Sequence, residues 1–266
     1  VSGPRPPAPA EGDLPPAFHP ADAATAAVAN AVSRIDRGAY ETIATMDRLT
    51  AFVAAAERAG RVAFAVLGSQ ADPMRGDICG IALAIAPGQS AYIPLAHRSR
   101  ADDLLGAGRA EGQIEAAAAL AKLRPLLEDP GILKIGYDVK AAVTLLARHG
   151  IALHPADDIM LMSYALDAGR GGSGFDMLSE RWLGHQPMAR KDVCGSGRNA
   201  VTFDLVGIDA ARPYAAELPD LAMRIWAVLR QRLAADRVTT VYETLERPLV
   251  PVLAAMERHG IAIDRQ

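Results

Sequence analysis

The chain has 266 residues, a formal net charge of −3, and hydrophobic residues at half of its positions. This composition allows a sizeable core and argues against a protein that coats nucleic acid through bulk positive charge, while leaving room for a local basic groove. Two cysteines and six scattered histidines do not indicate a disulfide framework or a zinc site. No apolar run approaches the ~20 residues of a membrane span, and the N-terminus lacks a secretory pattern, so we expect a cytoplasmic protein.

The first 39 residues differ in composition from the rest of the chain. Seven of residues 1–20 are proline, and few large apolar groups accompany them. Such a segment buries little surface and is typical of a semi-rigid linker. The alanine-rich stretch 21–35 predicts a helix within it. We expect the globular part to begin at Tyr40.

A short strand at 40–44 and a helix open the globular part. The helix is indicated by apolar residues at helical spacing, namely Leu49, Phe52, Val53 and Ala56. Residues 62–67 form an almost continuous apolar run, as a buried central strand does. Further strands at 79–85 and 91–95 complete a predicted antiparallel meander.

The second half alternates helices with one short strand and then becomes helical. Helices are expected at 114–127, 139–149, 158–166, 177–183 and from 206 onward, with a strand at 132–135. The glycine-rich loop at 169–174 lacks the Gly-Lys-Ser/Thr ending of a phosphate loop, so we interpret it as a plain connection. This order of elements predicts a mixed α/β sheet covered by helices.

Seven segments carry a family resemblance, and they are Gly80–His97, Leu126–Pro130, Leu133–Gly136, Leu178–Leu183, Gly195–Asn199, Arg212–Glu217 and Glu246–Asp264. In this order they resemble successive parts of the DEDD-type 3′–5′ proofreading exonuclease domain of bacterial DNA polymerase I. The last segment is similar to the opening of the polymerase domain. The resemblance implies a ribonuclease H-like α/β fold, with a mixed sheet and flanking helices, preceded by the proline-rich linker.

The resemblance also implies a division of the chain. Residues 1–39 would be the linker with a possible helix, 40–236 the exonuclease-like domain, and 237–266 the start of a polymerase domain. The expected partner is therefore the polymerase domain of the same parent chain, in DNA replication and repair. DNA would be bound weakly or through the parent protein.

In this family two divalent ions, held by four carboxylates, hydrolyse the phosphodiester, and a tyrosine orients the water. The resemblance places the first two carboxylate positions at Ala65 and Leu67, the next at Ala142 and the last at Leu218, while Tyr214 keeps its identity. Apolar side chains cannot hold hard cations, which need anionic oxygens. The resemblance thus implies an inactive domain with no metal and no cofactor. We expect the four positions to converge beneath Tyr214.

Two alternatives remain open on the sequence. One is a residual metal-dependent exonuclease that uses displaced acids such as Asp138 and Asp220. The other is a protein-interaction module that keeps the fold. The acids near the four positions are more simply interpreted as solvated or capping residues, and they are Asp72, Asp77, Asp138, Asp158, Glu217 and Asp220.

Two further features bear on the site. Pro213 and Pro219 flank Tyr214 and Leu218, and a proline inside a helix costs ~3 kcal/mol, so we expect that helix to be free to kink. Five basic residues could contact phosphates, and they are Lys134, Lys140, Arg181, Lys191 and Arg198. The ordinary role of such residues is to form solvated surface.

Overall fold

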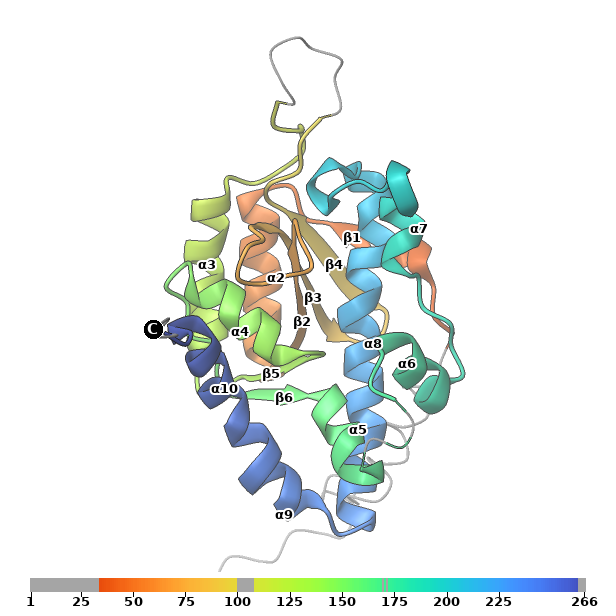
Figure 1. Cartoon of the computed structure of the whole chain (residues 1–266). Coiled ribbons are helices and arrows are strands. Elements are labelled where there is room, and N and C mark those ends of the chain that lie inside the picture. Colours follow the sequence, from red (N-terminus) through yellow and green to blue (C-terminus); the bar gives the residue numbers. More distant parts are fainter. Residues whose placement is uncertain (1–33, 100–107, 169, 171, 263–266) are drawn as a thin grey trace, which may run out of the picture.

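The computed structural model describes residues 34–99, 108–168, 170 and 172–262. At its centre lies a six-stranded sheet with the order β1-β4-β3-β2-β5-β6 (Figure 1). The strands are β1 (Glu41–Thr42), β2 (Arg61–Gly68), β3 (Ile78–Ala86), β4 (Gln89–Pro94), β5 (Leu133–Gly136) and β6 (Ala156–Asp158). The linker and helix expected over residues 1–33 lie outside the described residues.

The sheet is mixed, as predicted. Strands β2, β3 and β4 form the antiparallel meander, and β2 lies at the centre between β3 and β5. Strand β1 is parallel to β4, while β5 and β6 continue parallel to β2. The sequence did not predict β6, which is only three residues long and follows Pro155.

One face of the sheet is covered by α2 (Met46–Ala59), α3 (Ala116–Glu128) and α4 (Val139–Ala147). Side chains at alternate positions of β2, Val62 and Phe64, point into the core on this side, because successive strand residues face opposite ways. Helix α2 ends at Gly60, whose φ of 65° is a left-handed conformation that glycine adopts without strain.

The opposite face is crossed by α8 (Ile208–Ala235), flanked by α5 (Ile159–Asp167) and α6 (Phe175–Leu183) (Figure 1). Helix α8 is a single 28-residue element, so the two prolines inside it do not end it. In the turn before Pro219, the hydroxyl of Ser90 donates a 2.6 Å hydrogen bond to the carbonyl of Ala216. Helix α8 packs on β2, β3 and β4 through a long series of buried residues, and this packing outweighs the local cost of the prolines.

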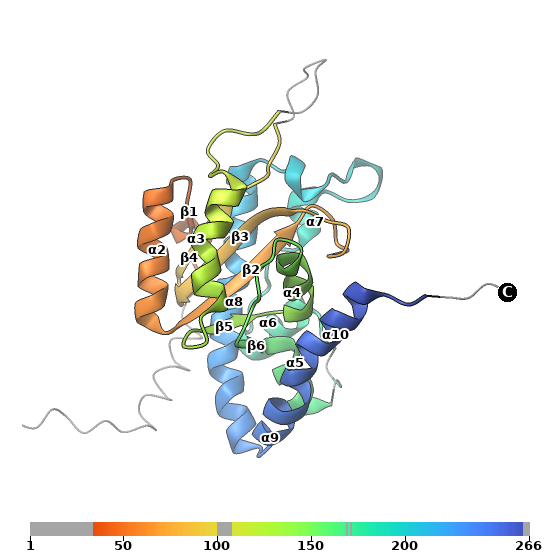
Figure 2. The ribbon, with the colours of Figure 1, turned by 90° about the vertical axis from the view of Figure 1, so that its left-hand side faces the viewer.

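The C-terminal part continues from α8 through α9 (Thr239–Val241) and a π-helical turn, η4 (Tyr242–Glu246), into α10 (Arg247–His259). Figure 2 shows α10 lying across β6 and reaching α4. A short helix, α7 (Arg190–Cys194), precedes α8 in the chain. Within the part of the chain that the structure describes, no helix is both long and apolar enough to span a bilayer.

Candidate functional site

Four of the five positions implied by the resemblance meet on the α8 side of the sheet. Leu67 and Ala65 of β2 share one apolar cluster with Tyr214 and Leu218 of α8. Ala142 packs into a different cluster, the one beneath α2, α3 and α4. The structure therefore groups two strand positions with two helix positions in one cluster, and Ala142 belongs to the cluster on the other face of the sheet.

The space next to Leu67 and Tyr214 is filled by an aromatic core. The ring of Phe203, fully buried, lies 5.9 Å from that of Tyr214 and 5.5 Å from that of His97, measured between centroids. His97 Nδ1 lies 2.8 Å from the Val206 carbonyl, which can only accept, so Nδ1 carries the proton. His97 Nε2 then accepts a 2.6 Å bond from the hydroxyl of Tyr92, and burial lowers the pKa of this imidazole.

A guanidinium borders the same cluster, and no pattern in the sequence indicated it. Arg190, the first residue of α7, donates from Nη2 to the Gly68 carbonyl at 3.1 Å. Its guanidinium carbon lies 5.2 Å from the centroid of the Phe203 ring. Gly68, which follows Leu67, and Phe203 of the aromatic core therefore both contact the Arg190 guanidinium.

Glu217 and Asp220 are structural anchors, not the solvated acids expected from the sequence. The Glu217 side chain is 1% exposed and accepts from Arg37 Nε at 2.7 Å, His185 Nε2 at 2.8 Å and the Met188 amide at 2.8 Å. Helix α8 turns both residues inward because it is packed along much of its circumference, which a helical wheel alone does not reveal.

Asp220 is engaged in the same way. Its Oδ2 accepts from the Tyr40 hydroxyl at 2.7 Å, and its Oδ1 accepts from the Gly88 amide at 2.7 Å and from Arg224 Nε at 3.0 Å. Both carboxylate oxygens therefore serve the fold. Asp220 offers a metal ion no oxygen without breaking these bonds.

The remaining acids serve turns, caps and ion pairs. Asp72 accepts from the Met74 amide, Asp77 pairs with Arg148 and Asp158 caps α5. Asp138 precedes α4 in a left-handed conformation with φ of 48°. Among the described residues, no group of three or more His, Cys, Asp or Glu is arranged to hold a metal ion.

The five basic candidates for phosphate contact separate into three groups. Lys134 is fully buried and donates from Nζ to the Asp129 carbonyl at 2.7 Å. It is therefore not a candidate for phosphate contact. Burial in β5 lowers the pKa of Lys134 to about 8. Lys140 pairs with Glu257 and Arg181 pairs with Asp167. Lys191 and Arg198 form the third group, and both are exposed.

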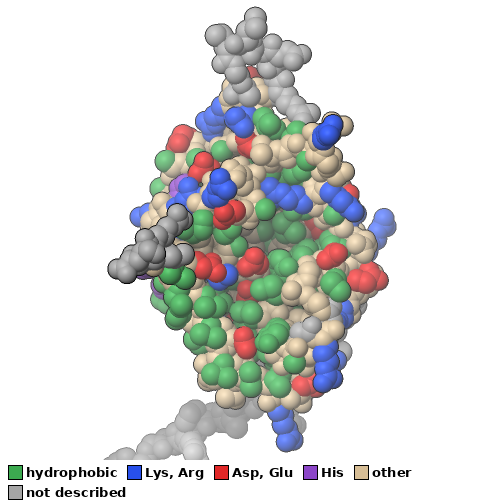
Figure 3. Space-filling model, viewed as in Figure 1, with side chains coloured by type: hydrophobic (Ala, Val, Ile, Leu, Met, Phe, Trp, Pro, Cys, Tyr) green, Lys and Arg blue, Asp and Glu red, His purple; other side chains and the backbone are tan. Residues whose placement is uncertain are grey.

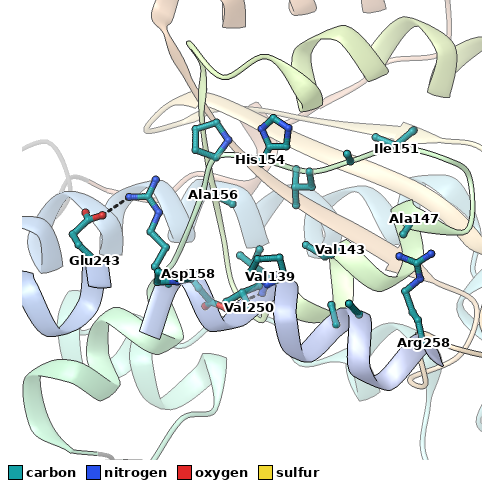
Figure 4. Close-up of a pocket in the computed structure, with 18 of the residues that line it drawn as sticks. Val139, Val143, Ala147, Ile151, His154, Ala156, Asp158, Glu243, Val250 and Arg258 are labelled. Carbon is teal, nitrogen blue, oxygen red and sulfur yellow. Dashed lines mark hydrogen bonds and ion pairs between the residues drawn. The ribbon is translucent and has the colours of Figure 1, made fainter. Parts of the chain in front are cut away.

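A cavity of about 800 Å³ lies away from these positions, between α4, β6 and α10 (Figure 4). Its walls are mainly aliphatic, with Val139 and Val143 on one side and Val250 on the other. Arg247 at its rim pairs with Glu243 at 2.6 Å. The cavity marks the seam along which α10 packs on the sheet domain.

The strand order and the helices on both faces define a ribonuclease H-like exonuclease fold. A family model described as 3′–5′ exonuclease matches residues 40–234. The chain therefore belongs to the 3′–5′ exonuclease family, which confirms the resemblance drawn from the sequence.

A sequence relative supports this family assignment, and solved structures support the fold. The chain is 48% identical over 280 residues to DNA polymerase I of Rhizobium leguminosarum, a match that covers 100% of this chain and 28% of the relative. The POL domain of Pol1 from M. smegmatis, in complex with DNA primer-template and dNTP, aligns with a TM-score of 0.62 and 22% identity, over 84% of this chain and 33% of that one. RNase D of Escherichia coli aligns with a TM-score of 0.58 and 19% identity, over 84% and 51%.

Proposed function

We propose that the chain is a catalytically inactive 3′–5′ exonuclease-like domain of a cytoplasmic DNA polymerase I, in which it supports DNA-templated synthesis during replication and repair. The observation that carries this proposal is the chemistry at the end of β2. Hydrocarbon side chains stand at Ala65, Leu67 and Leu218, with Ala142 on α4. These groups do not fit the pair of divalent ions on which phosphodiester hydrolysis in this family depends, because such ions need several oxygen ligands.

The displaced-acid alternative loses support from the buried carboxylates. A metal ion at Asp220 or Glu217 would have to compete with hydrogen bonds from three donors at each residue. Asp138 remains partly exposed, but a single carboxylate supplies too few ligands for a divalent ion. Hydrolysis through displaced acids would therefore need large rearrangements of α8.

The outer face of α10 supports a role in holding another part of the parent protein. Its inner face packs on the domain through Val250 and Ala254. Its outer face, together with η4, exposes a row of large apolar side chains at helical spacing, which are Leu245, Leu249, Val252, Leu253 and Met256. Figure 3 shows hydrophobic side chains gathered over this region. An apolar surface of this kind is typical of an interface.

We assign this face to the polymerase part of the parent chain. The chain spans about a quarter of the length of the DNA polymerase I relatives it matches, so a much larger polypeptide is available to cover α10. In this proposal residues 40–236 form the inactive domain and 237–266 begin the polymerase domain. A free interaction module that binds other proteins is the alternative for the same surface.

Digestion of a 3′-labelled single strand with magnesium or manganese tests the loss of activity. We expect no shortening above the metal-free background, while an active 3′–5′ exonuclease on the same strand serves as the control. Shortening that depends on manganese and disappears in Asp138→Asn, or in Asp220→Asn under conditions where that variant stays folded, would establish the displaced-acid alternative instead.

Co-purification with the C-terminal remainder of the parent polymerase tests the interface. Leu249→Asp with Val252→Asp should abolish the association, since both side chains are about half exposed on the outer face, at 46% and 51%. Met177→Asp, which alters a 50% exposed methionine on α6, is the matched control. Equal binding by all variants would contradict this assignment.

A further inference from the structure

The guanidinium of Arg190 stands at the C-terminal end of β2. It donates to the carbonyl of Gly68, the residue directly after Leu67. The same guanidinium lies over Phe203, which is in turn next to Tyr214. Arg190 therefore occupies the edge of the cluster that holds Leu67, Tyr214 and Leu218.

The charge of Arg190 acts on its surroundings from this place. Burial raises the pKa of the Tyr214 hydroxyl, and the nearby Arg190 guanidinium opposes that rise. On the adjacent strand β3, burial raises the pKa of the Cys79 thiol to about 12, and the charge of Arg190 acts against this rise. Among the described residues, Arg190 forms no ion pair with a carboxylate, so its charge is not neutralised locally.

We infer that Arg190 is a resident cation that takes the place of divalent metal at this cluster and excludes metal ions from it. The inference rests on the proposed function, because it concerns the site that has lost its carboxylates. It goes further in assigning a cause of metal exclusion that is independent of the missing ligands.

Two consequences follow from electrostatics. A divalent ion placed among positions 65, 67 and 218 would be repelled by the guanidinium that is hydrogen-bonded to Gly68, the residue directly after Leu67. Carboxylates restored at these positions would be attracted to Arg190, so they would form ion pairs with it before they formed a metal site. Restoring the ligands alone is therefore not enough.

Manganese titration by calorimetry on the 266-residue chain tests this inference. The starting variant carries Ala65→Asp, Leu67→Glu, Ala142→Asp and Leu218→Asp. Addition of Arg190→Gln should tighten manganese binding by at least about tenfold, because it removes one positive charge beside the ion. Addition of Lys191→Gln is the matched control, since it removes one charge from the exposed neighbour on α7 and should leave binding weak.

Two results of the titration would overturn the inference about Arg190. Tight manganese binding by the four-fold variant with Arg190 intact would overturn the inference, and so would equal binding by the Arg190→Gln and Lys191→Gln versions. Where the Arg190→Gln version does not fold, manganese-induced broadening of backbone amide signals is followed in the four-fold variant. Broadening confined to residues near 65, 67 and 218 would then overturn the inference, and its absence would support it.

This test is distinct from that of the proposed function. Manganese binding and strand shortening by the unmodified chain would refute the inactive-domain proposal. The behaviour of the four-fold variants, by contrast, reports only on Arg190.

Discussion

The hydroxyl of Tyr40 donates a 2.7 Å hydrogen bond to Oδ2 of Asp220, across 180 residues of sequence. The first residue of the family match is thereby tied to the middle of α8. Both groups are buried, and the Asp220 carboxylate also holds the β3–β4 turn through the Gly88 amide. One carboxylate thus joins three segments that are distant in the chain.

Asp220→Asn should lower the free energy of unfolding by about 3 kcal/mol, because it removes the charge that Arg224 faces in a buried ion pair. Asp209→Asn, on the exposed start of the same helix, should cost less than about 1 kcal/mol. Urea denaturation at pH 7 measures both. Equal losses in the two variants would show that Asp220 is not an anchor.

Tyr242 links α10 to the edge of the sheet. Its hydroxyl donates to Asp157 Oδ1 at 3.0 Å and accepts from the Asp158 amide at 3.0 Å. Tyr242→Phe should cost about 1–3 kcal/mol, since it leaves the buried Asp158 amide without this acceptor. Amide hydrogen exchange should speed up selectively in α10. Thr244→Ala, which removes an exposed hydroxyl from the same turn, should leave the exchange pattern unchanged.

Gly80 leaves room for the aromatic core. A Cβ added there would lie 2.3 Å from the Tyr92 hydroxyl, the group that hydrogen-bonds His97. Gly80→Ala should therefore destabilise the fold by about 1–3 kcal/mol through overpacking. Gly207→Ala is the control, because a Cβ at Gly207 meets nothing within 4 Å. An equal drop in melting temperature for both substitutions would contradict the expected clash.

Asp158 should make stability depend on pH. Burial raises its pKa to about 6 in the folded state, against about 3.9 in an unfolded chain. Because the native state holds this proton more tightly, the contribution to stability is complete below about pH 3.9 and is lost as pH rises through about 6. The stability of the unmodified chain relative to Asp158→Asn should thus fall by about 2–3 kcal/mol between pH 4 and pH 7. A constant difference in urea denaturation across this range would disprove it.

Any direct binding of nucleic acid should depend on the exposed basic residues. Lys191→Ala with Arg198→Ala should weaken binding of a fluorescent single strand and reduce the slope of log K against log salt by about one for each phosphate that is no longer neutralised. Lys134→Met should leave that slope unchanged, since Lys134 is fully buried. Equal effects of both changes in fluorescence anisotropy would refute this assignment.

The sequence predicted most of the elements because their apolar patterns are long and regular. The apolar residues expected in the first helix are all buried in α2, and the run at 62–67 is the centre of β2. Strand β6 was not predicted because its three residues are too few to show a periodic pattern, and the five residues of α7 are likewise too few. Short elements are fixed by their neighbours more than by their own composition.

The site was harder to predict than the fold. Strand periodicity correctly put Ala65 and Leu67 on one face. It could not show that Lys134 is buried, because the polar end of that side chain reaches a carbonyl outside its strand. Neither could it reveal Arg190, whose position depends on how the start of α7 packs at the end of β2. These are tertiary relationships between residues distant in sequence.

Both edges of the sheet are very short, with two residues in β1 and three in β6. A short edge exposes few unpaired amides and carbonyls, and α10 lies against the β6 edge. The domain is thereby protected from strand-to-strand association with other copies. A fragment cut before Thr239 would lose that cover and leave the β6 edge open to pairing.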